Sequence, residues 1–271
     1  MMRLRRNGQR LSGQFATGIK RRWRSLLGII LGAIAALLFT SPWSPTLAQP
    51  SLPPPQVHAL PPFIERLPQL EADYFDEIQT TPLGYLVWSE FPVKIYVQQL
   101  ADEPIPAADQ DDFEKWVKAV DVAIADWQEY VPLLKVTESE QADITVWRQR
   151  PPRDIRIDRD NQRLIIPDAR HGTARYEFYL TETESPTESP LIKHRFNVTL
   201  SPAQNSKHLR GTARHELGHA LGLWGHSPDE EDVMYRQQVR RPPPISGRDL
   251  SVLRRVYGQP TRLGWQLVDN S

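Results

Sequence analysis

The sequence of 271 residues contains no cysteine. This absence excludes disulfide bonds, thiolate metal sites, cysteine nucleophiles and lipid attachment through cysteine. No internal repeat of solenoid length is present. The length suits one main folded domain with additional segments. With 39% hydrophobic residues, the chain must be held by an apolar core, to which bound metal ions can add stability.

Acidic residues are absent before Glu65, whereas eight Lys or Arg residues precede residue 26, so the remainder of this formally neutral chain carries a net charge of −8. A basic arm can bind nucleic acid, but here fifteen apolar, uncharged residues follow it, 26 to 40. As a helix they would span about 22 Å, short of the roughly 30 Å core of a bilayer. With a small-residue exit at Ala48, this pattern predicts a signal peptide over residues 1–48.

The protein is therefore expected to be exported, as a secreted, periplasmic or cell-surface protein, and to have no nucleic-acid partner. An uncleaved signal anchor is the alternative reading, and it would be the only contact with a membrane.

Prolines, 25 in all, divide the rest of the chain. Residues 49–62 are Pro-rich and predict an extended linker, in which His58 has no expected role. An N-terminal extension is expected at 63–90, the main folded domain at 91–262 and a short tail at 263–271.

Alternating β-branched and aromatic residues predict strands at 91–98, 133–139, 142–150, 173–180 and 194–201, and a hairpin within 155–166. Residues 111–131 form an amphipathic helix by their apolar spacing of three and four. A second helix is expected at 205–224, capped by Asn205 or Ser206, and a third at 246–258. The order predicts an α+β fold with a mixed sheet and few helices.

The segment 215–226 reads HELGHALGLWGH. On a helix, His215 and His219 lie one turn apart on one face and can present imidazole nitrogens to a single ion. Glu216 follows the first histidine, as in the H-E-x-x-H pattern of zinc peptidases. Its expected role is general base for water bound at the metal, rather than ligand.

A catalytic zinc site needs a third protein ligand and keeps its fourth position for water. Gly222 permits a positive-φ turn, and Gly222 or Gly225 is expected to end the helix. His226 then comes within reach and is the expected third ligand. Asp229 and Glu231 are competing candidates.

Together with Met234, eight residues beyond His226, this stretch resembles the metzincin signature and, within it, the matrixin branch. Residues 246–258 resemble the last helix of matrixin catalytic domains. The resemblance implies a zinc endopeptidase of metzincin-like α+β fold: a twisted, mostly parallel sheet, two long helices of which one carries the motif, and a small C-terminal subdomain with a Met-turn and a terminal helix. It implies one catalytic zinc ion and protein or peptide substrates, with Met234 packing beneath the imidazoles.

The sequence departs from the matrixin pattern in three respects. The family places its third histidine at the position of Gly225, so a one-residue insertion precedes His226. Matrixins often carry an inhibitory propeptide cysteine, which this chain lacks. The family's loop for structural zinc and calcium is not recognisable.

Asp168, His171 and His194 are candidates for a second metal ion, but we interpret them as ordinary residues and leave a structural Ca²⁺ or a second Zn²⁺ as an open alternative. His208 and Tyr235 are not expected to bind zinc. A monomeric exported zinc endopeptidase is the leading hypothesis, and a non-catalytic metal- or peptide-binding module on the same fold is the alternative.

Overall fold

The computed structural model of the protein describes residues 51–151, 156–158, 163–165, 171–183, 185 and 188–268. The expected signal peptide, residues 1–48, lies outside these described residues. Among them, no helix has both the length and the apolar character required to cross a membrane.

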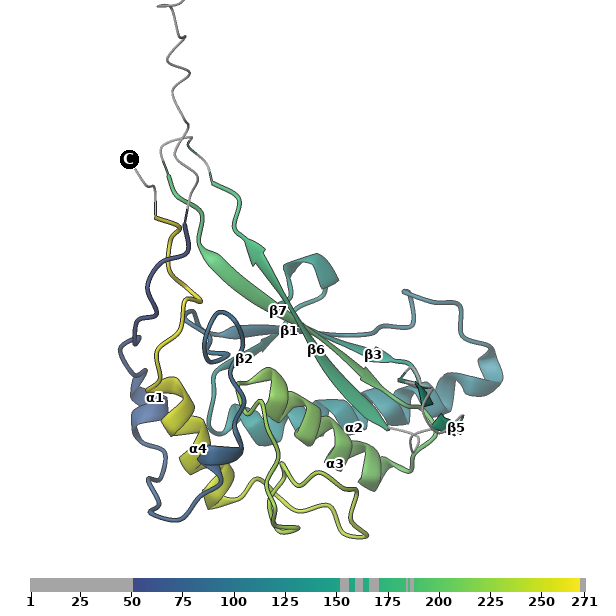
Figure 1. The fold of residues 1–271 in the computed structure, drawn as a ribbon. Coiled ribbons are helices and arrows are strands. Elements are labelled where there is room, and N and C mark those ends of the chain that lie inside the picture. The colour runs from purple at the N-terminus through teal and green to yellow at the C-terminus, as the bar shows by residue number, and fades with distance from the viewer. Residues whose placement is uncertain are drawn as a thin grey trace, which may run out of the picture. The chain divides into compact units, whose positions relative to one another are not determined.

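A five-stranded sheet forms the centre of the fold, with strand order β2-β1-β3-β7-β6 (Figure 1). Its first four strands run parallel and only β6 is antiparallel to its neighbour. The strands span, in chain order, β1 Val93–Val97, β2 Leu133–Lys135, β3 Ile144–Arg148, β6 Gly172–Leu180 and β7 Ile192–Leu200. This confirms the α+β fold with a mostly parallel sheet.

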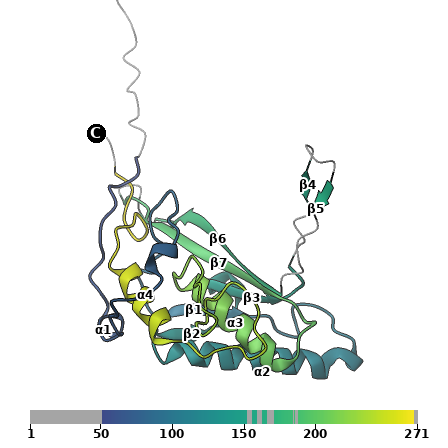
Figure 2. The same cartoon turned by 60° about the horizontal axis from the view of Figure 1, so that its bottom comes forward.

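Two long helices, α2 Gln110–Gln128 and α3 Ser206–Ala220, pack against each other along one face of the sheet (Figures 1 and 2). The apolar stripe expected on α2 is buried: Phe113, Trp116, Val120, Ile124 and Trp127 are at most 2% exposed. Trp127 joins the two helices directly, because its indole N–H donates to the backbone oxygen of Arg214 at 2.9 Å. Burial of such aromatic side chains, about 1.5–3 kcal/mol each, stabilises the helix pair.

The hairpin expected within 155–166 is present as β4 Arg156–Asp158 paired antiparallel with β5 Arg163–Ile165, separate from the main sheet (Figure 2). Short 3₁₀ turns occur at Phe75–Glu77, Ala107–Asp109 and Ser139–Gln141, and a four-residue helix α1 at Pro62–Glu65.

The terminal helix α4, Gly247–Tyr257, begins with a capping box in which Ser246 and Asp249 exchange side-chain to backbone hydrogen bonds. Such reciprocal bonds satisfy two backbone donors at the helix start. Asp249 and most apolar residues of α4 are buried, so the helix is part of the core rather than an appendage.

The Pro-rich segment 49–62 is not the free linker that its composition predicts. Over its described residues it is extended, but backbone bridges join Ser51 to Val268 and Gln56 to Thr261. The first bridge places it beside the segment predicted as a C-terminal tail, and the second places it beside the last residues of the predicted main domain. Proline content restricts backbone angles, but it does not prevent the remaining N–H groups from pairing with another segment.

His58, expected to have no role, packs within this same contact. Its ring stacks on Trp265 at a centroid distance of 4.5 Å, and its Nε2 lies 2.8 Å from the backbone oxygen of Leu263. It serves the packing of the two terminal segments.

Candidate metal centre and cleft

Helix α3 carries the two motif histidines and is held at both ends by specific hydrogen bonds. The Asn205 side chain accepts from the backbone N–H of His208 at 3.0 Å, which caps the start of the helix. At the other end, Trp88 donates to the backbone oxygen of Ala220 at 2.8 Å and Tyr257 to that of Leu221 at 3.2 Å. These bonds satisfy carbonyl groups that a helix end leaves without an internal partner.

His215 and His219 lie on one face of α3, with ring centroids 4.7 Å apart. Their Nδ1 atoms lie 2.8 Å from the backbone oxygen of Val233 and 2.7 Å from that of Leu223, respectively. Since a carbonyl oxygen only accepts, Nδ1 of each ring carries the hydrogen and Nε2 keeps its lone pair. Such bonds fix the orientation of a ligating imidazole.

Burial keeps both rings in the neutral form that a metal ion requires. Desolvation lowers the pKa of His215, against a smaller opposing effect of its bond to Val233. It lowers the pKa of His219 further below the ordinary value, with His215 and His226 as secondary causes.

The chain turns back toward these rings immediately after α3. Gly222 has φ +120°, and a Cβ there would also lie 2.7 Å from the backbone oxygen of Leu86. Both facts require glycine at the turn. Gly225 was expected to share this role, but the helix has already ended at Ala220, and Gly225 is required for a different reason: a Cβ there would overlap the backbone oxygen of Glu77.

The turn brings His226 to the other two histidines. Its ring centroid lies 5.3 Å from that of His215 and 5.0 Å from that of His219. One ring nitrogen of each histidine lies within 4.8 Å of those of the other two, and this is the one such group of three possible ligands among the described residues. Three imidazoles that converge in this way fit the donor set of a catalytic zinc site.

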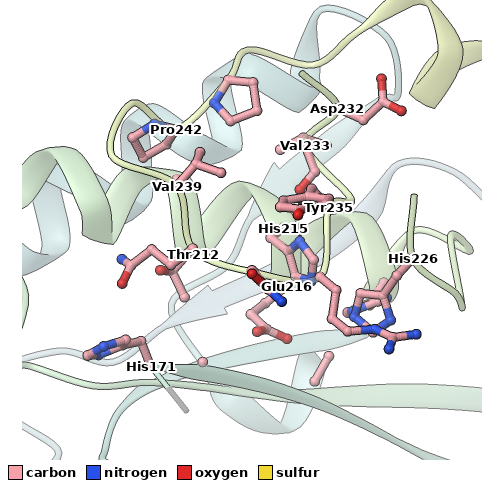
Figure 3. A pocket seen from close by; sticks show the side chains of 18 of the residues that line it. His171, Thr212, His215, Glu216, His226, Asp232, Val233, Tyr235, Val239 and Pro242 are labelled. Carbon is pink, nitrogen blue, oxygen red and sulfur yellow. Dashed lines mark hydrogen bonds between the residues drawn. The ribbon is translucent and has the colours of Figure 1, made fainter. Parts of the chain in front are cut away.

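Glu216 lies beside the triad with 8% of its surface exposed. In Figure 3 its carboxylate lies between His171 and His215. Gly172, the first residue of β6, leaves the space for it, because a Cβ there would lie 2.7 Å from both Cγ and Oε1 of Glu216. Gly172 is not among the site residues predicted from the sequence. A glycine in a strand, which marks a close approach of another group, was the signal available.

The histidines and Glu216 line a cleft of about 930 Å³. One wall is the beginning of β6, and the opposite wall is the segment after Met234, where Val239 and Pro242 face Thr212 of α3 (Figure 3). Gln79 of the N-terminal extension also lines it. A cleft of this size and mixed lining is suited to an extended polymer segment or a small molecule.

Met234 is fully buried beneath α3, where its Sδ occupies the space that a side chain at Gly218 would need. It is held by its backbone: the N–H of Ser227 donates to its oxygen at 2.9 Å. Asp249 of α4 accepts from the N–H groups of Val233 at 2.9 Å and Met234 at 3.4 Å. Helix α4 therefore supports this turn, and the turn positions the backbone oxygen of Val233 that bonds to His215.

The competing third ligands are not in the cleft wall. Asp229 forms an ion pair with Arg248 at 2.7 Å, and Glu231 is exposed. Tyr235 and His208 line the cleft but do not belong to the histidine triad.

The candidates for a second metal ion do not form a cluster among the described residues. His194 is buried and stacks on Trp88 at a centroid distance of 3.9 Å, with no hydrogen-bond partner for its Nε2 in the described part of the chain. His171 lines the cleft instead. Asp168 lies outside the described residues.

Comparison with known proteins agrees with this geometry. No curated protein matches the chain. The family model of the matrixins, peptidase family M10, matches residues 103–258, which is more than half of the sequence and includes α2, the main sheet beyond β1, the histidine triad and α4. This match implies a zinc metallopeptidase with protein or peptide substrates. The chain therefore belongs to the matrixin family.

Proposed function

We propose that this protein is an exported zinc-dependent endopeptidase, with His215, His219 and His226 as the metal ligands and Glu216 as the general base. The observation that carries the proposal is the convergence of three imidazole nitrogens within 4.8 Å of one another, beside a carboxylate in an open cleft. A site that only binds metal has no use for a base at that position.

The residues of the chain divide the chemistry among them. The three imidazoles would hold a zinc ion, which when bound acts as a Lewis acid on the peptide carbonyl and lowers the pKa of water. Glu216 accepts a proton from the attacking water and passes it to the departing amine, so that the carboxylate is regenerated. The neighbouring β6 and the segment after Met234 hold the substrate on either side of these groups.

The first experiment separates catalysis from metal binding. We expect Glu216→Gln to lower casein hydrolysis by a factor of about 10²–10⁴, the usual contribution of a general base, while one zinc ion per chain is retained. Chelation should abolish the hydrolysis of the wild type, and added zinc should restore it. A wild type that binds zinc but cleaves no member of a peptide library would instead indicate the non-catalytic binding module.

Export is tested by the mature N-terminus. We expect mass spectrometry of the protein recovered from its natural compartment to place that terminus near Gln49, because the basic segment, the apolar run and the small residue at Ala48 form the pattern of a cleaved signal. A full-length chain found in the membrane fraction would favour the uncleaved anchor. We further propose that the protein is a monomer, to be checked by light scattering.

A further inference from the structure

The loop that carries the third histidine contains the insertion, and its bonds to α3 end at Leu223, whose N–H donates to the backbone oxygen of Gly218 at 3.0 Å and whose oxygen accepts from His219. Within the loop, short backbone bonds such as Trp224 N–H to Gly222 O at 2.8 Å curl the chain. Such local bonds do not tie Trp224 and Gly225 to the helix. Beyond His226, the N–H of Ser227 donates to the backbone oxygen of Met234 at 2.9 Å. The stretch between Leu223 and Ser227 is therefore where a further element can act on the position of His226.

The N-terminal extension supplies that element. Its Gln79 N–H donates to the backbone oxygen of Trp224 at 2.8 Å, and Ile78 forms an antiparallel bridge with Gly225. The approach is so close that only glycine fits at 225, since a Cβ would overlap the backbone oxygen of Glu77. The extension thus pairs with Gly225, the residue directly before His226, within the segment that contains the insertion.

The residues that precede this pair in the extension are anchored on α4. Tyr74 is buried and donates from its hydroxyl to Asp249 at 2.6 Å. Arg255 of α4 pairs with Asp73 at 2.5 Å and lies over the ring of Phe75 at 4.1 Å. Asp249 also accepts a hydrogen bond from the backbone of the Met-turn. The same carboxylate therefore contacts both the N-terminal extension and the turn that bonds to His215.

We propose that residues 73–79 of the N-terminal extension are a permanent part of the metal centre, which fix the His226 loop by backbone pairing with Trp224 and Gly225. The inference rests on the proposed zinc site. It assigns Ile78 and Gln79 as positioning residues, not catalytic ones. It also implies that maturation retains the chain from Asp73 onward, so this extension is not a removable inhibitory segment.

The decisive variant is Gln79→Pro, which removes the N–H that bonds to Trp224. Ile78 has φ −79° and ψ 125°, the extended conformation that a residue before proline adopts. Gln79→Ala is the matched control, because it removes the same side chain from the cleft and keeps the N–H.

We expect Gln79→Pro to raise the dissociation constant for zinc about 10–100-fold relative to Gln79→Ala, the range seen when the support of a metal ligand is lost. Competition with a chromophoric chelator measures the constant without any activity assay. Equal zinc affinity in the two folded variants would overturn the inference and leave the proposed function intact. A wild type that binds no zinc would overturn both.

Hydrogen exchange on the wild type gives an answer even if Gln79→Pro does not fold. Because coupling between sites is reciprocal, zinc should protect the amide of Gln79. The amide of Gln56 belongs to the same N-terminal region, but it donates to Thr261 at 2.9 Å and not to the His226 loop. Its exchange rate should therefore change less when zinc binds. Equal changes, or none at Gln79, would contradict the proposal, as would a natural N-terminus after residue 79.

Discussion

Helix α3 and the loop from Gly222 to Tyr235 supply histidines to the same cleft, but they are held in different ways. On the helix, the spacing of four residues places His215 and His219 on one face by backbone geometry alone. In the loop, the position of His226 depends on bonds to segments far away in sequence, since Gln79 pairs with Trp224 and Asp249 supports Val233.

The difference shows where evolution of such a site has freedom. A helix tolerates no inserted residue between its two ligands, because one extra residue rotates the second ligand by about 100° around the axis. The loop has absorbed one before His226, and the N-terminal extension pairs with Gly225, the residue directly before that histidine. The comparison predicts that loss of a long-range contact lowers the free energy of unfolding more when the contact supports the loop than when it supports the helix.

Removal of the carboxylate that supports the loop, Asp249, should lower the free energy of unfolding most. Asp249 is fully buried and accepts hydrogen bonds from Tyr74, Val233, Met234 and the backbone of Ser246. Asp249→Ala leaves these buried donors without their acceptor, so we expect the free energy of unfolding to fall by about 3 kcal/mol or more. Urea denaturation of the zinc-free protein measures this change.

The matched change on the helix side is Arg210→Ala. Arg210 of α3 pairs with Asp126 at 2.5 Å and its side chain is 43% exposed, while Asp126 keeps a second partner in Arg214 at 3.6 Å. A partly solvated pair of this kind contributes about 1 kcal/mol or less. If the two alanine variants lose equal stability, the contrast between loop and helix is wrong.

An intermediate effect is expected at the junction of the two regions. Gly222→Ala places a Cβ at φ +120° and 2.7 Å from the backbone oxygen of Leu86, which should cost about 1–3 kcal/mol of unfolding free energy. Gly258 ends α4 with φ −84° and a Cβ there would meet only ordinary contacts at 3.5 Å or more. Gly258→Ala should therefore be neutral or slightly stabilising, and calorimetry of both variants distinguishes a strained glycine from a tolerant one.

The same division explains what could be read from the sequence. The helices α2 and α3, the strands and the i, i+4 histidine pair follow from local periodicity. Nothing local indicates that the backbone oxygens of Val233 and Leu223 will orient the rings, because every residue carries such an oxygen. The role of Gly225 was assigned to helix termination for the same reason: the opposing segment at Glu77 is almost 150 positions away.

Histidine itself gives the last comparison, between the three rings that converge on the cleft and His194 in the core. By residue type alone, His194 is a candidate ligand for a second metal ion. Its place on β7, within an apolar face against Trp88 and Phe196, makes it a packing residue. Periodicity predicted the strand correctly but did not indicate that this position faces inward.

Burial lowers the pKa of His194 to about 3 from an ordinary value near 6.5. The unfolded chain therefore takes up a proton as the pH falls below about 6.5, whereas the folded chain does not, and folding loses stability by up to about 1.4 kcal/mol per pH unit. His194→Phe retains an aromatic ring against Trp88 and removes this proton, so its unfolding free energy should fall less between pH 7 and pH 5 than that of the wild type. Both proteins are compared by urea denaturation with a chelator present, so that the ligand histidines contribute equally. Identical pH slopes would mean that His194 reaches solvent and that the core around it is less closed than the structure indicates.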